Sequence, residues 1–207
     1  GCSKLPKAFC EFGGNREMPG MVISTACLKL IPATVALARA EIRDRDEFAR
    51  LLGALVPNNW PPETLVDALP VFLGWLEAAP DSVGWFGWYA LATGDGTTTP
   101  HLVASGGFKG PPQKGAVELG YSVLPQFQGR GYATELVCGL IQWVLEQPGV
   151  VRIVAETEWA NPASVRVLIK AGFARIGPAL EPGGGRFEFP GSASAADPCT
   201  PIALTSL

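Results

Sequence analysis

The residues that most clearly suggest chemistry are two glycines separated by one residue, Gly129 and Gly131. They lie between an expected strand at residues 116–124 and an expected helix at residues 132–145. Glycines in such a turn let successive backbone N–H groups approach a bound anion, and the positive end of the helix dipole adds to the attraction. The turn therefore suits a phosphate or a pyrophosphate.

Three interpretations of this turn compete. A dinucleotide-binding fingerprint fits the order strand, turn, helix and strand, with Glu156 and Glu158 ending the second strand, but the third glycine is missing and residues 125–128 lengthen the turn. A phosphate-binding P-loop is excluded, because no Gly-Lys-Ser/Thr follows. In the second interpretation Gly129 and Gly131 only make a tight connection. The third rests on a longer pattern around them.

The longer pattern, Val123-x-Pro125-x-x-Gln128-Gly129-x-Gly131-x-Ala133, resembles the acyl-CoA signature of the GNAT-type N-acetyltransferases. The resemblance continues in residues 106–110, 118–121, 161–164 and 170–173, and covers most of residues 21–190. The second half is most similar to the branch that includes the ribosomal-protein N-terminal alanine acetyltransferases. The resemblance implies an acetyl-CoA-dependent N-acetyltransferase that moves an acetyl group directly, in a ternary complex, to a primary amine of a small molecule or a protein N-terminus.

The resemblance also implies a CoA site. The backbone of Tyr121 and Val123 would pair with pantetheine where two strands part, as an added strand pairs with a sheet edge, and an N–H there would stabilise the oxyanion. Asn161 and Ser164 would face the pantetheine arm, although Asn161 before a proline is also an ordinary helix start. The pyrophosphate would be held by the backbone of Gln128, Gly129, Arg130, Gly131, Tyr132 and Ala133.

The catalytic groups are less determined. An amine must lose its proton before it attacks a thioester, so a carboxylate base is expected, and Glu118 and Glu156 are both candidates. Each is equally an ordinary strand carboxylate. Leu168 stands where many members of the family carry a tyrosine that protonates the leaving thiolate. Ser164, Tyr121 or water would replace it, or the thiolate would leave unprotonated, since a thiol pKa is near 8.5.

The acceptor pocket is expected between the two N-terminal helices and at their connection, with Asn59 and Trp60 as candidate lining residues. The missing tyrosine leaves one alternative function open, a non-catalytic module that binds acyl-CoA. A homodimer is a habit of the family that the sequence neither supports nor opposes.

The elements that must position these residues alternate between strands and helices. The fold class is mixed α/β, and the resemblance implies a GNAT-like, mostly antiparallel central sheet that is splayed at the acyl-CoA site and flanked by about four helices. Strands are expected at residues 27–31, 85–93, 100–108, 116–124, 150–155, 175–176 and 186–189, and helices at residues 34–56, 63–78, 132–145 and 161–171.

The composition argues against several other classes of protein. The chain has 207 residues and a net charge of −3, which argues against a non-specific nucleic-acid binder. No apolar run approaches the roughly 18 residues of a membrane span. Five cysteines without a Cys-x-x-Cys pair, and one histidine, predict no metal site and fit a cytoplasmic protein. Residues 1–20 read as a loose extension or tag, residues 21–190 as the catalytic domain and residues 191–207 as a flexible tail.

Overall fold

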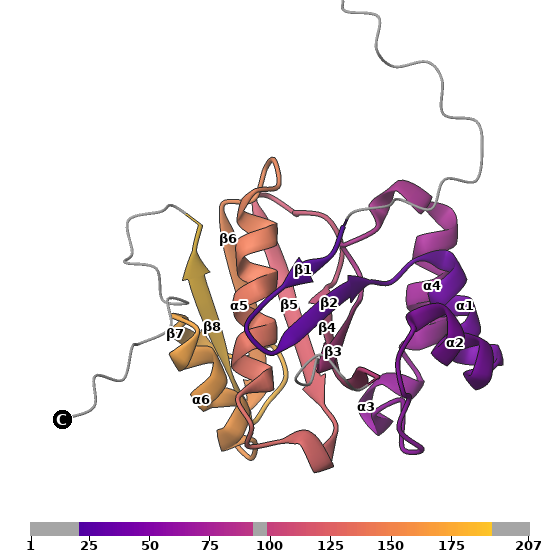
Figure 1. The fold of residues 1–207 in the computed structure, drawn as a ribbon. Helices are drawn as coiled ribbons and strands as arrows, with labels where there is room; N and C mark the ends of the chain where they lie inside the picture. Colours follow the sequence, from indigo (N-terminus) through magenta and orange to yellow (C-terminus); the bar gives the residue numbers. More distant parts are fainter. Residues whose placement is uncertain (1–20, 93–98, 192–207) are drawn as a thin grey trace, which may run out of the picture.

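One sheet of eight strands forms the centre of the computed structural model, which describes residues 21–92 and 99–191 (Figure 1). The strand order is β1-β2-β3-β4-β5-β6-β8-β7, and β5 and β6 are parallel whereas the other neighbours are antiparallel. The predicted extension at residues 1–20, and the predicted tail beyond Gly191, lie outside the described residues. The strands are β1 (Ile23–Ser24), β2 (Leu28–Pro32), β3 (Trp88–Ala92), β4 (His101–Phe108), β5 (Ala116–Val123), β6 (Arg152–Glu158), β7 (Ala174–Pro178) and β8 (Gly184–Pro190).

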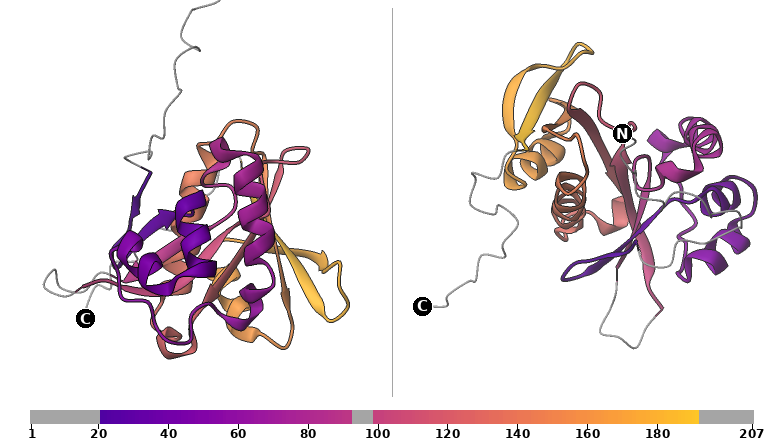
Figure 2. Two further views of the ribbon diagram at one scale, coloured as in Figure 1. Left: turned by 90° about the vertical axis from the view of Figure 1, so that its right-hand side faces the viewer. Right: turned by 90° about the horizontal axis from the view of Figure 1, so that it is seen from above.

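Helices cover both faces of the sheet, as the view from above shows (Figure 2). The N-terminal helices α1–α4 pack on one face of β2–β4, and the later helices α5 and α6 pack on the other face of the sheet. The helices are α1 (Val35–Arg43), α2 (Arg45–Leu52), α3 (Glu63–Val66), α4 (Leu69–Ala78), α5 (Tyr132–Leu145) and α6 (Pro162–Lys170), with short 3-10 turns η1 (Pro80–Ser82) and η2 (Pro125–Phe127). The predicted mixed α/β architecture is confirmed.

Side-chain alternation along β5 decides what each face of the central sheet carries. Val117 and Leu119 are buried in the core that includes Leu136 and Leu140 of α5. Because successive strand residues point to opposite faces, Glu118 and its even-numbered neighbours face the side of α1–α4. Helix α5 begins and ends where the sequence predicts, since its buried residues recur at helical spacing. Strand β5 and helix α5, with the turn between them, are thus held together by a shared core.

The helix predicted over residues 34–56 is wrong as a single element. It divides at Asp44, whose extended backbone (φ −151°) ends α1 and whose carboxylate accepts the N–H groups of Asp46 and Glu47 at the start of α2. An aspartate that caps a new helix competes with continuation of the previous one. Beyond α2, Leu55 forms an isolated bridge with His101 of β4 instead of a helical turn.

The helix predicted over residues 63–78 is also divided, into the single turn α3 and the longer α4. Pro70 lies in the first turn of α4, where its missing N–H costs nothing, but within a continuous helix its ring would clash with the carbonyl four residues earlier. Strand β3 begins at Trp88 and not at residue 85, because η1 and the turn after it precede it. Strand β1 was not predicted, since two residues show no periodicity.

Candidate functional site

Strands β5 and β6 part in the middle of the sheet. They pair only from Ala116 with Arg152 to Leu119 with Ala155. Beyond that point β5 continues beside β4 as far as Val123, while β6 continues beside β8 as far as Glu158. The two strands therefore enclose a wedge, and the predicted splay of the sheet is confirmed.

The backbone of β5 presents hydrogen-bonding groups to this wedge. The N–H of Lys109 donates to the carbonyl of Glu118 at 3.0 Å, and the N–H of Leu124 donates to that of Val103 at 3.1 Å, so even-numbered residues of β5 bond to the β4 side. Backbone groups alternate in direction along a strand, so those of Tyr121 and Val123 face the wedge. The Val123 carbonyl accepts a hydrogen bond from Nε2 of Gln128 at 3.1 Å. The N–H of Val123 and the N–H and carbonyl of Tyr121 face the wedge, where a further extended segment could pair with them.

The glycine turn follows at the open end of the wedge. Gly129 and Gly131 have φ values of 76° and 86°, which side chains with a Cβ rarely adopt, and a Cβ at either position would meet nothing within 4 Å. The turn thus needs glycine for its conformation, and the space above it is open. Gly131 is the N-cap of α5 and supplies no side-chain cap, so the first N–H groups of this helix point into the open space at the turn, where an anion could bind. The guanidinium of Arg130 lies 5.7 Å from the ring of Phe127.

A hydroxyl pair bridges the wedge on the α6 side. The Tyr121 hydroxyl lies 2.7 Å from Oγ of Ser164 and donates to the Ser164 carbonyl at 3.1 Å. Burial raises the pKa of Tyr121 to about 12, so this phenol stays protonated at neutral pH. Asn161 caps α6, as predicted, by accepting the N–H of Ser164 at 3.1 Å. Leu168, at the position of the absent tyrosine, is 1% exposed and packs in the core.

Two carboxylates lie on the opposite face of the wedge, toward α1–α4. Glu118 forms an ion pair with Lys109 and its side chain is 26% exposed. Glu156 forms an ion pair with Arg186 at 2.9 Å, accepts the N–H of Leu180 at 3.2 Å, and is 18% exposed. Between them on this face is Gly120, which is exposed and whose Cβ would meet nothing within 4 Å. Both predicted base candidates therefore flank open space at the wedge.

The segment at residues 57–62 lies in the connection between α2 and α3, and it is called here the acceptor loop after the amine pocket that the sequence analysis expects there. The indole N–H of Trp60 donates to Glu41 at 2.8 Å, and the hydroxyl of Tyr89 donates to the same carboxylate at 2.6 Å. Trp60 is only 6% exposed, because its indole packs beneath the loop, and its place in the amine pocket stays a prediction. Burial raises the pKa of Glu41.

Three residues of this region were missed by the sequence analysis. Arg45 donates to the carbonyls of Val56, Pro57 and Trp60, and Gln126 exchanges two hydrogen bonds with Asn59. Only Glu41 had a signal: it follows the buried Leu37 by four residues and so lies on the apolar side of its helix. The other contacts join segments too far apart in the sequence to be inferred from spacing.

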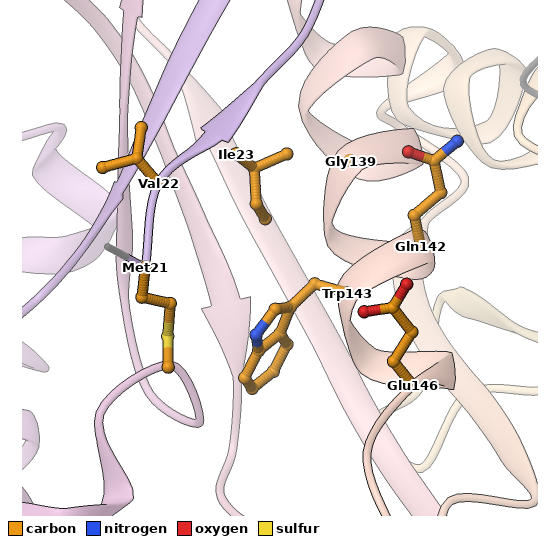
Figure 3. Close-up of a pocket in the computed structure, with 7 residues that line it drawn as sticks. All are labelled: Met21, Val22, Ile23, Gly139, Gln142, Trp143 and Glu146. Atoms are coloured by element: carbon orange, nitrogen blue, oxygen red, sulfur yellow. The ribbon is translucent and has the colours of Figure 1, made fainter. Parts of the chain in front are cut away.

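A separate hollow of about 320 Å³ lies between β1 and the C-terminal half of α5 (Figure 3). The ring of Trp143 points into the space between the two elements, and the polar lining residues are Gln142 and Glu146. It is remote along α5 from Gly131, and it contains none of the predicted site residues. The predicted site residues gather at the wedge and not at this hollow.

The described ranges contain no group of three or more His, Cys, Asp or Glu side chains that could hold a metal ion. Within the same ranges, no helix has the length and apolar character needed to cross a bilayer.

Comparison with known proteins agrees with the geometry. Residues 31–174 match the family model described as an acetyltransferase (GNAT) domain. An uncharacterized N-acetyltransferase of Bacillus subtilis, YjdG, is 27% identical over 154 residues, which cover 74% of this chain and 89% of the relative. The ribosomal-protein-S5-alanine acetyltransferase from Vibrio fischeri has a similar fold, with a TM-score of 0.56 and 16% identity over 86% of this chain and all of that one. RimL, a ribosomal L7/L12 α-N-protein acetyltransferase solved with coenzyme A, gives a TM-score of 0.54 and 18% identity over 82% of this chain and 97% of its own.

Proposed function

Because the chain belongs to the GNAT family of N-acetyltransferases, we propose that it binds acetyl-CoA in the β5–β6 wedge and transfers the acetyl group directly to a primary amine in a ternary complex. The observation that carries the proposal is the wedge itself, which opens beside a glycine turn at the N-terminus of α5. The acceptor is a small-molecule amine or a protein N-terminus.

The residues present fit acetyl-CoA. The turn from Gln128 to Ala133 offers backbone N–H groups and a helix dipole to the pyrophosphate, with Arg130 adding positive charge. The wedge-facing groups of Tyr121 and Val123 match the amides of pantetheine, as an added strand matches an open edge. The same edge would place the thioester carbonyl near Gly120, where a wedge-facing N–H of β5, at Tyr121 or Val123, stabilises the oxyanion.

Proton transfer from the amine is assigned to Glu118 or Glu156, directly or through water. Each lies on the face of the wedge that is open beside Gly120, so each can reach an amine that approaches from the side of α1–α4. Glu156 is the first residue of β6 past the last β5–β6 pair, but both of its oxygens already accept hydrogen bonds. Glu118 has one basic partner, Lys109, which is itself largely exposed.

Stabilisation of the leaving thiolate is assigned to Ser164. Its Oγ donates a hydrogen bond to the sulfur, and the Tyr121 hydroxyl then turns its single proton from the Ser164 carbonyl to Oγ, so the pair replaces the tyrosine absent at Leu168. Asn161 holds the first turn of α6 and with it Ser164. A thiolate is already a tolerable leaving group, so hydrogen-bond stabilisation without full proton transfer suffices.

Thermal unfolding with acetyl-CoA, CoA and NAD tests the binding step. A ligand at about 100 times its dissociation constant adds ~2.7 kcal/mol, which is roughly 5–10 °C for a domain of this size. Gly131→Glu should abolish the shift, because its carboxylate repels the pyrophosphate. Gly183→Glu is the matched control: Gly183 also has a positive φ, of 93°, and open space around it, but lies in the turn before β8.

Release of free thiol from acetyl-CoA in the presence of a panel of primary amines tests the transfer step. Turnover with at least one amine supports the enzyme. Binding without any turnover would favour the non-catalytic acyl-CoA-binding module, and a shift with NAD alone would contradict both.

A further inference from the structure

The acceptor loop and the CoA turn are joined by a reciprocal pair of amide hydrogen bonds. Nδ2 of Asn59 donates to Oε1 of Gln126 at 3.0 Å, and Nε2 of Gln126 donates to Oδ1 of Asn59 at 2.9 Å. Gln126 is the middle residue of η2, the turn between β5 and the glycines. The pair, called here the amide bridge, therefore connects the two sides of the site directly.

On the acceptor side, the rest of the loop is fixed to the body of the protein. Arg45 donates to the carbonyls of Pro57 and Trp60 in the loop and to that of Val56 just before it. Glu41 accepts the indole N–H of Trp60. Leu55, just before the loop, bridges to His101 of β4. Asn59 itself is exposed, and its hydrogen bonds with Gln126 reach across to the CoA side.

On the CoA side, Gln126 lies two residues before Gln128, the first of the proposed pyrophosphate-binding residues. Its neighbours Leu124 and Phe127 are anchored, since Leu124 is buried and Phe127 packs against both cores. Occupation of the amides from Gln128 onward restrains η2, because the two segments are consecutive in the chain. A restraint on η2 reaches the loop through the bridge, and ordering at one site lowers the entropic cost of ordering at the other.

We propose that the amide bridge couples the two substrate sites, so that acyl-CoA bound at the turn orders the exposed part of the acceptor loop, Asn58 and Asn59, for the amine. Asn59 and Gln126 are then positioning residues and contact neither the thioester nor the reacting nitrogen. The inference rests on the proposed function, because it requires CoA at the glycine turn. By reciprocity, an ordered loop also strengthens CoA binding.

Hydrogen exchange of the Asn58, Asn59 and Trp60 amides tests the coupling without knowledge of the amine. These are the N–H groups of the loop, since its other three residues are prolines, and exchange is measured with and without CoA as the probe. In the wild type, CoA should slow exchange in the loop about fivefold, and Gln126→Ala should abolish this difference. The exchanged pair Asn59→Gln with Gln126→Asn keeps the summed side-chain length and should restore it. Asn58→Ala, at the exposed neighbouring position, should leave it intact.

A purely structural role predicts a different pattern, in which Gln126→Ala speeds exchange equally with and without CoA. That result, or a CoA-dependent slowing that persists in Gln126→Ala, would overturn the coupling while leaving the proposed function in place. If CoA causes no thermal shift in the wild type, the proposed function fails and the coupling fails with it. Both readouts use the full chain.

Discussion

A valine at position 120 should block acetyl transfer without damaging the fold. Gly120 has an ordinary φ, its Cβ would meet nothing within 4 Å, and it faces the side from which the amine is proposed to arrive. A valine there adds three carbons to the space between the two base candidates. Misplacing reacting groups by about 1 Å costs roughly 100-fold in rate, so Gly120→Val should lower kcat/KM by at least that factor.

Stability should move in the opposite direction. Glycine in a strand loses more chain entropy on folding than other residues, and valine favours strands, so Gly120→Val should leave the free energy of unfolding unchanged or raise it by up to about 1 kcal/mol. Gly177→Val is a matched control, because Gly177 also lies in a strand, β7, with ordinary φ and open space at its Cβ. It should keep full turnover.

Thiol release and thermal unfolding of the two variants together give the result. Turnover of Gly120→Val within about threefold of wild type would refute the placement of the reacting centre beside this residue. Equal losses in both variants would show instead that added bulk in any strand disturbs the enzyme.

Three further predictions concern proton transfer and burial. Of Glu118→Gln and Glu156→Gln, one should lose about 100-fold in kcat/KM together with the acid limb of its pH profile, and wild-type rates in both across pH 6–9 would exclude a carboxylate base. Ser164→Ala should lower kcat by about 100-fold at neutral pH, and the deficit should shrink above pH ~8.5, where the free thiolate is the stable form of the product; Tyr121→Phe should show a milder form of the same profile. Burial raises the pKa of Glu41 above its ordinary value of 4.5, so the folded protein holds this proton more tightly than the unfolded chain, and the stability it contributes falls as pH rises from below 4.5 through the raised pKa. Urea unfolding between pH 4 and 7 should show that fall in the wild type minus Glu41→Gln, and a flat difference would mean that Glu41 ionises as in the unfolded chain.

The C-terminal half of the fold was predictable because its signals are local. Glycines at positive φ, a capping Asn161 before a proline, and the alternation along β5 each act within a few residues, and together they gave the turn, α5 and the start of α6. The N-terminal half was predicted less well. Asp44 reads as one more charge in a helical pattern, and its role as a cap depends on where the chain turns next.

Contacts between distant segments were not predictable at all. The amide bridge joins residues 67 positions apart, and Glu156 meets Arg186 only because β6 and β8 are neighbours in the sheet. Trp60 looked like a loop residue because prolines surround it, yet Glu41 and Tyr89 give its indole a buried partner and a packing surface. Hydrogen bonds and ion pairs between such side chains depend on which segments the tertiary structure brings together.

The two substrates of the proposed reaction are met by different kinds of groups, and this bears on which amine the enzyme accepts. The CoA side is built mainly from backbone, at Tyr121, Val123 and the glycine turn, so its form follows from the fold. The proposed acceptor side carries two ion pairs whose charges balance, Lys109 with Glu118 and Arg186 with Glu156. A face without net charge creates little long-range attraction for a polycation. We therefore expect selection of the amine to depend on short-range contacts with the acceptor loop, which the amide bridge connects to the CoA turn.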